Sequence, residues 1–172
     1  MDKEIWGTAI KPTAPCCSSG SWVWDDGGRD EAGFSGSAGD CVTRAIAIAT
    51  NKPYKEVYDV MAKGNETQRR SKHDRKSAGK RTARNGINIR RKWFRDYMES
   101  VGFEWTPTMS IGSGCKVHLK ASELPQGRLV VQVSKHMVAV IDGAIHDTYD
   151  CSRDGTRCVY GYWKEMREWN IA

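Results

Sequence analysis

A cysteine, a histidine and an aspartate in this chain have the residue types and the order of a thiol-based catalytic site. Cys41 lies in the first third of the chain, and His136 and Asp147 follow far downstream. A thiol becomes a nucleophile at neutral pH when a nearby base accepts its proton, and that base needs a third group to orient it. These three residues can fill those roles, so the sequence predicts a thiol-dependent enzyme.

Cys41 stands where a helix is expected to begin. The Ala and Ile residues at 45–49 are apolar on all sides, as in a buried helix, and Gly39 or Asp40 can cap its start. The dipole and the free backbone N–H groups of a first helical turn favour a thiolate. Cysteine is often merely a buried residue, but this position favours Cys41 as the nucleophile.

The histidine and the aspartate fall on a predicted β-hairpin. Asp142-Gly143 is typical of a two-residue type I′ turn. If these two residues form the turn, Ile141 pairs with Ala144 and the register of the whole hairpin is set.

This register selects the base and the acid. Side chains alternate along a strand, so His136 and Asp147 share one face and are diagonal neighbours. His146 points to the other face together with Met137, and Asp142 is in the turn. We therefore expect His136 as the general base and Asp147 as the residue that orients it. The other residues expected on their face are Val138 and Tyr149.

A second cysteine–histidine pair, Cys115 and His118, is a weaker candidate. Cys115 follows a Gly-Ser-Gly segment and precedes a predicted strand rather than a helix. It therefore lacks the helix dipole that would stabilise its thiolate.

The remaining elements predict a single α+β domain over residues 1–172. Helices come first, and the strands that follow are expected to form an antiparallel sheet. Residues 1–40 are expected to be irregular. The expected helices cover 41–50, 53–64 (from Pro53 to a stop at Gly64) and 89–101, and the expected strands cover 103–108, 116–120, 128–134, 136–141, 144–149 and 158–163.

A basic segment interrupts the domain as a loop and helix insertion at about 65–101. Residues 69–95 hold 12 of the 27 Lys and Arg residues and one acid, whereas the whole chain has a net charge of +6. Such a segment indicates a polyanion or an acidic substrate surface as partner, or else a solvated insertion. The candidate polyanion-binding residues are Arg69, Arg70, Lys72, Arg75, Lys76, Lys80, Arg81 and Arg84.

The cysteines are expected to be reduced, and neither a metal nor a cofactor is expected. The first residues lack the layout of a secretory signal, and no apolar run is long enough to span a membrane. We therefore predict a cytoplasmic protein without disulfides. The spacings of Cys16-Cys17 and of Cys151 and Cys158 do not match a zinc site; the role of Cys16 and Cys17 stays open.

The pattern resembles the papain-like cysteine peptidase superfamily, in particular compact bacterial and phage members such as the peptidase C39-like group. The likeness rests on the helix-start Cys41, the His-x-Val-x-Val-Ile-Asp-Gly segment from His136, and Asp147. It covers residues 22–62 and 128–163. It implies a papain-like fold in which a helix bearing Cys41 packs on an antiparallel sheet bearing His136 and Asp147.

One feature of that superfamily is missing. Papain-like enzymes carry a Gln before the Cys whose amide binds the oxyanion, but residues 1–40 contain neither Gln nor Asn. The backbone N–H of Cys41 can supply one donor. The second is expected from Ser35, Ser37 or Arg29.

Three functions remain open. The first is hydrolysis of an amide, peptide or isopeptide bond through Cys41, His136 and Asp147, with a protein or peptide substrate that has an acidic surface. The second is an inactive papain-like scaffold that binds nucleic acid, the less favoured partner, or another polyanion. The third is an acyltransferase or a ubiquitin-like deconjugase that uses the same thiol.

Overall fold

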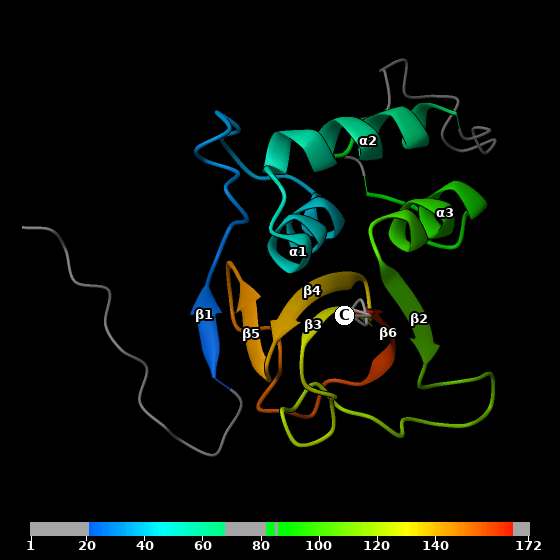
Figure 1. The fold of residues 1–172 in the computed structure, drawn as a ribbon. Helices are drawn as coiled ribbons and strands as arrows, with labels where there is room; N and C mark the ends of the chain where they lie inside the picture. Colours follow the sequence, from blue (N-terminus) through cyan, green and yellow to red (C-terminus); the bar gives the residue numbers. More distant parts are fainter. Residues whose placement is uncertain (1–20, 68–81, 85, 167–172) are drawn as a thin grey trace, which may run out of the picture.

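The protein is an α+β domain in which helices cover one face of a mixed sheet (Figure 1). The computed structural model describes residues 21–67, 82–84 and 86–166. The helices are α1 (Cys41–Thr50), α2 (Tyr54–Glu66) and α3 (Lys92–Ser100). The strands are β1 (Trp22–Trp24), β2 (Phe103–Pro107), β3 (Arg128–Val133), β4 (His136–Ile141), β5 (Ala144–Asp147) and β6 (Val159–Glu165), in the spatial order β1-β5-β4-β3-β6-β2.

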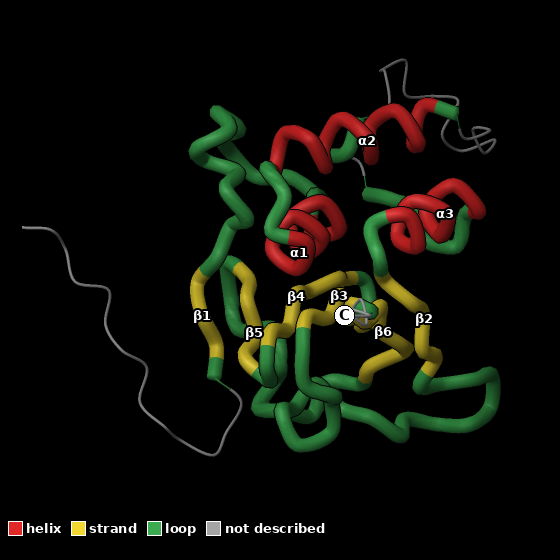
Figure 2. Tube along the Cα trace, in the orientation of Figure 1, coloured by secondary structure: helices red, strands yellow, loops and turns green. Residues whose placement is uncertain are grey.

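The layers follow from how the helices pack. Helix α1 lies on β4 and β3, α2 packs on the outer side of α1, and α3 covers β2 (Figure 2). The strand at the centre of the sheet, β3, is hydrogen-bonded to β4 on one side and to β6 on the other. Helix α1, which begins at Cys41, therefore rests on the most enclosed part of the sheet.

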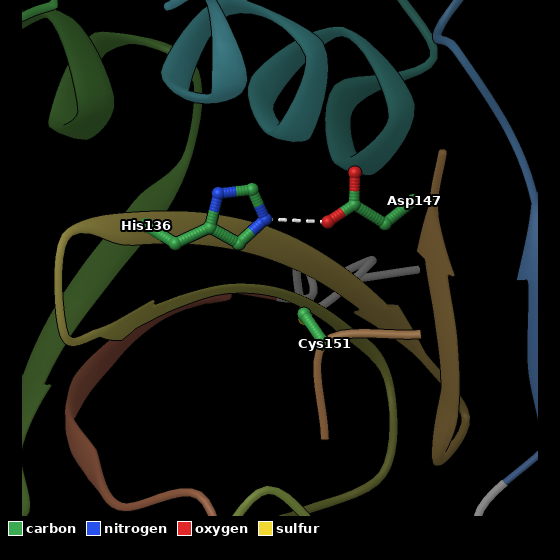
Figure 3. Close-up of side chains that lie close together, drawn as sticks. All are labelled: His136, Asp147 and Cys151. Carbon is green, nitrogen blue, oxygen red and sulfur yellow. Dashed lines mark hydrogen bonds and ion pairs between the residues drawn. The ribbon is translucent and has the colours of Figure 1, made fainter. Parts of the chain in front are cut away.

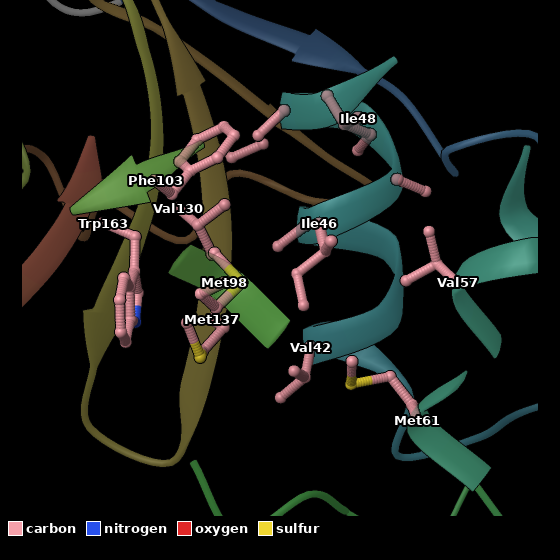
Figure 4. Packing of buried hydrophobic residues seen from close by; sticks show 14 of the residues in the cluster. Val42, Ile46, Ile48, Val57, Met61, Met98, Phe103, Val130, Met137 and Trp163 are labelled. Atoms are coloured by element: carbon pink, nitrogen blue, oxygen red, sulfur yellow. The ribbon is translucent and has the colours of Figure 1, made fainter. Parts of the chain in front are cut away.

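Strand alternation divides the core into two clusters. Val130, Met137 and Trp163 point to the helix side, where they pack with α1 and with Met98 of α3 (Figure 4). Val131, Val138 and other strand residues point to the opposite side, beneath the loop that carries Leu119 and Leu124. Burial on both faces explains why β3 is an almost uninterrupted apolar run.

The hairpin register predicted from Asp142-Gly143 is confirmed. Ile141 pairs with Ala144 and Ala139 with His146. Asp142 and Gly143 both have positive φ, of 48° and 84°. A type I′ turn needs this conformation at both central residues.

The prediction of an antiparallel sheet was only partly correct, because β1 pairs in parallel with β5 at the edge of the sheet. Trp22 pairs with Ile145 and Trp24 with Asp147, although residues 1–40 were expected to be irregular. The indole N–H of Trp22 donates to the Asp147 carbonyl at 3.1 Å. Three residues carry too little periodicity to be recognised as a strand, and the pairing spans more than 100 residues of chain.

Two further expectations were wrong. Helix α2 does not stop at Gly64 but continues to Glu66, and a Cβ at Gly64 would lie 2.4 Å from the ring of Trp93. Gly64 therefore allows α3 to approach α2. Residues 116–120 form no strand, and only a single bridge joins His118 to Cys158.

A disulfide joins Cys115 to Cys158, which corrects the expectation that all cysteines are reduced. It ties the loop after β2 to the chain just before β6. Among described cysteines, Cys41 and Cys151 are free. In the part of the chain that the structure describes, no helix has the length and apolar character needed to cross a membrane.

Candidate active site

Helix α1 begins at Cys41, as expected, and Cys41 is partly buried. The first backbone hydrogen bond of the helix runs from the Arg44 N–H to the Asp40 carbonyl, at 3.1 Å. The N–H groups of the first turn that precede it have no partner within the helix. The thiol therefore lies in a field of free donors that favours negative charge.

Asp40 occupies the N-cap position, but its carboxylate makes no capping hydrogen bond. It is 1% exposed and accepts hydrogen bonds from Arg29 Nε at 2.8 Å and from the Tyr54 hydroxyl at 2.6 Å. Burial and the neighbouring carboxylate raise the pKa of the Tyr54 hydroxyl, which keeps it protonated as a donor. Asp40 thus anchors the segment before Cys41 to α2.

His136 and Asp147 meet at the end of the hairpin. Nε2 of His136 lies 2.5 Å from Oδ2 of Asp147 (Figure 3). The other oxygen of Asp147 accepts a hydrogen bond from the Thr148 N–H at 2.8 Å and lies 3.6 Å from Arg44. Asp147 is therefore a buried carboxylate whose two oxygens are both engaged, and it fixes the orientation of the His136 ring.

The imidazole also lowers the pKa of the Cys41 thiol. Burial raises the pKa of Cys41, but hydrogen bonds from His136 and from the Met137 N–H outweigh it. The positive charges of His136 and Arg44 act in the same direction, so the pKa of the thiol is lowered. The result favours a thiolate at position 41.

The pKa of His136 is shifted in the opposite direction, upward. Burial lowers the pKa of its imidazole, but hydrogen bonds with Asp147, Cys151 and Cys41 raise it to about 11. A lowered thiol pKa beside a raised imidazole pKa describes a thiolate–imidazolium pair. Such a pair holds a nucleophile and a proton donor in contact.

Cys151 is a second thiol at the site, which the sequence did not single out. It is 1% exposed and contributes to the raised pKa of His136. Ligand atoms of His136, Asp147 and Cys151 lie within 4.8 Å of one another, a spacing that a metal ion could bridge (Figure 3). Arg44 beside Asp147 already supplies a positive charge there. We therefore assign Asp147 to the imidazole rather than to a cation.

The residues expected to complete the oxyanion site have other contacts. Arg29 is buried and donates to the carbonyls of Ser35 and Gly36, in addition to Asp40. Ser35 and Ser37 are exposed, and their carbonyls accept hydrogen bonds from Arg84. These residues hold the shape of the loop before Cys41.

Of the expected polyanion-binding residues, the structure describes Arg84 alone, and it braces that same loop. The others lie outside the described residues: Arg69, Arg70, Lys72, Arg75, Lys76, Lys80 and Arg81. So do Cys16 and Cys17. The rival pair is not formed, because Cys115 is in the disulfide and His118 contacts Glu123.

Gln132 was missed by the sequence analysis. It lies on β3 directly opposite Met137, whose N–H bonds the Cys41 thiol. Its alternation with Val131 and Val133, which pack on the far side, turns its side chain to the helix side of the sheet. The Gln132 side chain thus lies on the helix side of the sheet, one strand away from His136, although it is far from Cys41 in sequence.

No protein-family model, curated protein or solved structure matched this chain. The functional conclusion therefore rests on the chemistry of the site.

Proposed function

We propose that the protein is a thiol-dependent hydrolase that cleaves an amide, peptide or isopeptide bond through a thioester on Cys41. The observation that carries this proposal is the hydrogen bond between His136 and Asp147, together with the lowering of the Cys41 pKa by His136. A structural histidine needs no thiol of lowered pKa beside it, whereas a thiol nucleophile needs such a partner.

The proposed reaction has two halves. The Cys41 thiolate attacks the carbonyl carbon, and the imidazolium of His136 donates its proton to the leaving nitrogen as the C–N bond breaks. Water then attacks the thioester while His136 accepts its proton, and the carboxylic acid leaves as the C–S bond breaks and restores the Cys41 thiolate beside the imidazolium. Asp147 keeps the ring oriented and balances its charge in both halves.

The oxyanion that forms in each half needs two donors. The backbone N–H of Cys41, in the first turn of α1, can provide one. We assign the second to the side-chain amide of Gln132, in place of Ser35, Ser37 and Arg29. Gln132 would then play the part that a Gln before the Cys plays in papain-like enzymes.

The arrangement of helix and sheet supports a papain-like fold as part of this proposal. The nucleophile begins a helix that packs on the sheet, and the base and the acid lie on adjacent strands of that sheet. Transfer of the acyl group to an amine would use the same thioester. The products formed with and without an added amine would therefore separate a transferase from a hydrolase.

The test is covalent labelling followed by peptide mapping. A peptidyl vinyl sulfone should modify Cys41 in the wild-type protein, and cleavage of a casein digest should stop in Cys41→Ser. The matched control is Cys151→Ser, which removes the other free thiol that contacts His136. Labelling that falls on Cys151, or cleavage that persists in Cys41→Ser, would refute the proposal.

A further inference from the structure

A cleft of about 610 Å³ opens on the helix side of the sheet, between the start of α3 and strands β2 and β6. The loop after β2, over 107–114, forms its outer wall. It contains Ile111, which is fully exposed at the rim. This cleft was not part of the site as predicted from the sequence.

The cleft adjoins the candidate active site. Gln132 lines it and pairs across the sheet with Met137, whose N–H bonds the Cys41 thiol. A chain lying in the cleft would contact Gln132, which is one strand away from Met137 and His136. The cleft is therefore positioned to hold the part of a substrate that flanks the bond to be broken.

Its charge is of one sign. Of the described residues that line the cleft, Arg90 and Arg95 are charged and none is acidic. No ion pair between described residues uses either guanidinium, although Lys92 between them pairs with Asp96. Two exposed and uncompensated cations beside a cleft attract an anionic ligand.

The floor of the cleft is aromatic. Trp105 and Trp163 line it with ring centroids 5.4 Å apart. Trp105 also lies over Gly161, where a Cβ would come within 2.3 Å of the ring. The glycine thus lets the ring lie flat on the sheet and form a platform for a large apolar side chain.

We propose that this cleft binds an acidic peptide segment of the substrate, in which carboxylates flank a large apolar side chain. Arg90 and Arg95 pair with the carboxylates, and the apolar side chain packs on Trp105. The inference deepens the proposed function by naming the substrate class, and it rests on that function.

The experiment measures binding to Cys41→Ser, which cannot turn the ligand over. The probes are the peptides acetyl-Gly-Glu-Phe-Glu-Gly-amide and its twin with Gln in place of both Glu residues. Titration calorimetry at low salt should give at least about fivefold tighter binding of the Glu peptide. Added salt should reduce this ratio, because exposed charges are screened.

Two double variants in the same background locate the effect. Arg90→Gln/Arg95→Gln should abolish the preference for the Glu peptide. The matched control Arg91→Gln/Lys92→Gln removes the same charge from positions that do not line the cleft, and should keep the preference. All four side chains are exposed, and circular dichroism checks that both variants are folded.

Three results would overturn the inference: no measurable binding, equal affinities for the two peptides, or a preference that survives Arg90→Gln/Arg95→Gln. Alkylation of Cys41 by iodoacetamide in the wild-type protein shows whether only the cleft proposal fails or the proposed function fails as well. If Cys41 is reactive but the protein does not prefer the Glu peptide, the proposed role of the cleft is refuted and the proposed thiol chemistry is not. If Cys41 is unreactive but the preference for the Glu peptide is intact, the proposed thiol chemistry is refuted and the cleft remains a peptide-binding site.

Discussion

The guanidinium of Arg44 lies 3.6 Å from the carboxylate of Asp147, and this contact joins helix α1 to strand β5. Arg44 is one turn after Cys41 and also lies 3.8 Å from the buried Asp40. One side chain therefore connects the segment before Cys41 to the residue that orients His136. We consider Arg44 a positioning residue, because it acts on the thiol through its charge and through Asp147.

Replacing Arg44 should weaken the nucleophile without removing it. Its positive charge contributes to the lowered pKa of Cys41, so Arg44→Gln should raise that pKa toward its ordinary value. We expect a roughly tenfold slower alkylation of Cys41 near pH 6. Arg44→Lys, which keeps the charge, should recover part of the rate. An unchanged pH profile in Arg44→Gln would contradict this role.

Gln132 should matter for acyl chemistry but not for thiol reactivity. Loss of an oxyanion donor lowers turnover by about 10²–10³-fold, so Gln132→Ala should reduce peptide hydrolysis by a comparable factor. Alkylation by iodoacetamide forms no oxyanion and should keep its wild-type rate. The control is Gln126→Ala, at an exposed loop position. Equal losses in both reactions would indicate damage to Cys41 or to the fold instead.

The buried pair of Arg29 and Asp40 should be a large contributor to stability. Removal of one partner leaves an unpaired buried charge, so Arg29→Ala should lower the free energy of unfolding by about 3–5 kcal/mol. Tyr54→Phe removes one hydrogen bond to the same carboxylate and should cost about 1–2 kcal/mol. Urea denaturation measures both. The exposed control Lys55→Ala should change stability by less than about 0.5 kcal/mol, and an Arg29→Ala variant equally mild would contradict the assignment.

The disulfide should stabilise the fold without taking part in the chemistry. Cys115 and Cys158 are 43 residues apart, and closing a loop of that length stabilises a protein by about 4 kcal/mol. Cys115→Ser/Cys158→Ser should therefore melt at a lower temperature, while Cys41 keeps its reactivity. Peptide mapping without reductant should recover the linked peptides. Free thiols at both positions would show that the bond does not form.

Features encoded locally were the ones that could be predicted. The start of α1 follows from small residues before a short apolar run, and the register of β4 and β5 follows from Asp142-Gly143. These two local signals suffice to bring His136 beside Asp147. They do so because a two-residue turn leaves no freedom in the pairing.

Features that depend on distant chain segments could not be predicted. The contact of Arg44 with Asp147, the approach of Cys151 to His136 and the addition of β1 all join segments that no local pattern relates. In the sequence, Gln132 is a single polar residue in an apolar strand. Its position beside the site becomes apparent only from its pairing with Met137 across the sheet. The disulfide was missed because redox state was inferred from the N-terminal residues and not from the proximity of the two cysteines.

The state of the Cys41 sulfur can be measured through the absorbance of thiolates at 240 nm. The difference between wild type and Cys41→Ser should show a step whose midpoint lies below the ordinary pKa of a thiol, about 8.5. His136 has a pKa of about 11, so its imidazolium should accompany the thiolate from that step up to strongly alkaline pH. His136→Gln should move the step up to 8.5 or higher. A wild-type step already at 8.5 or above would show that position 41 holds an ordinary thiol, and that this site is not a thiolate–imidazolium pair.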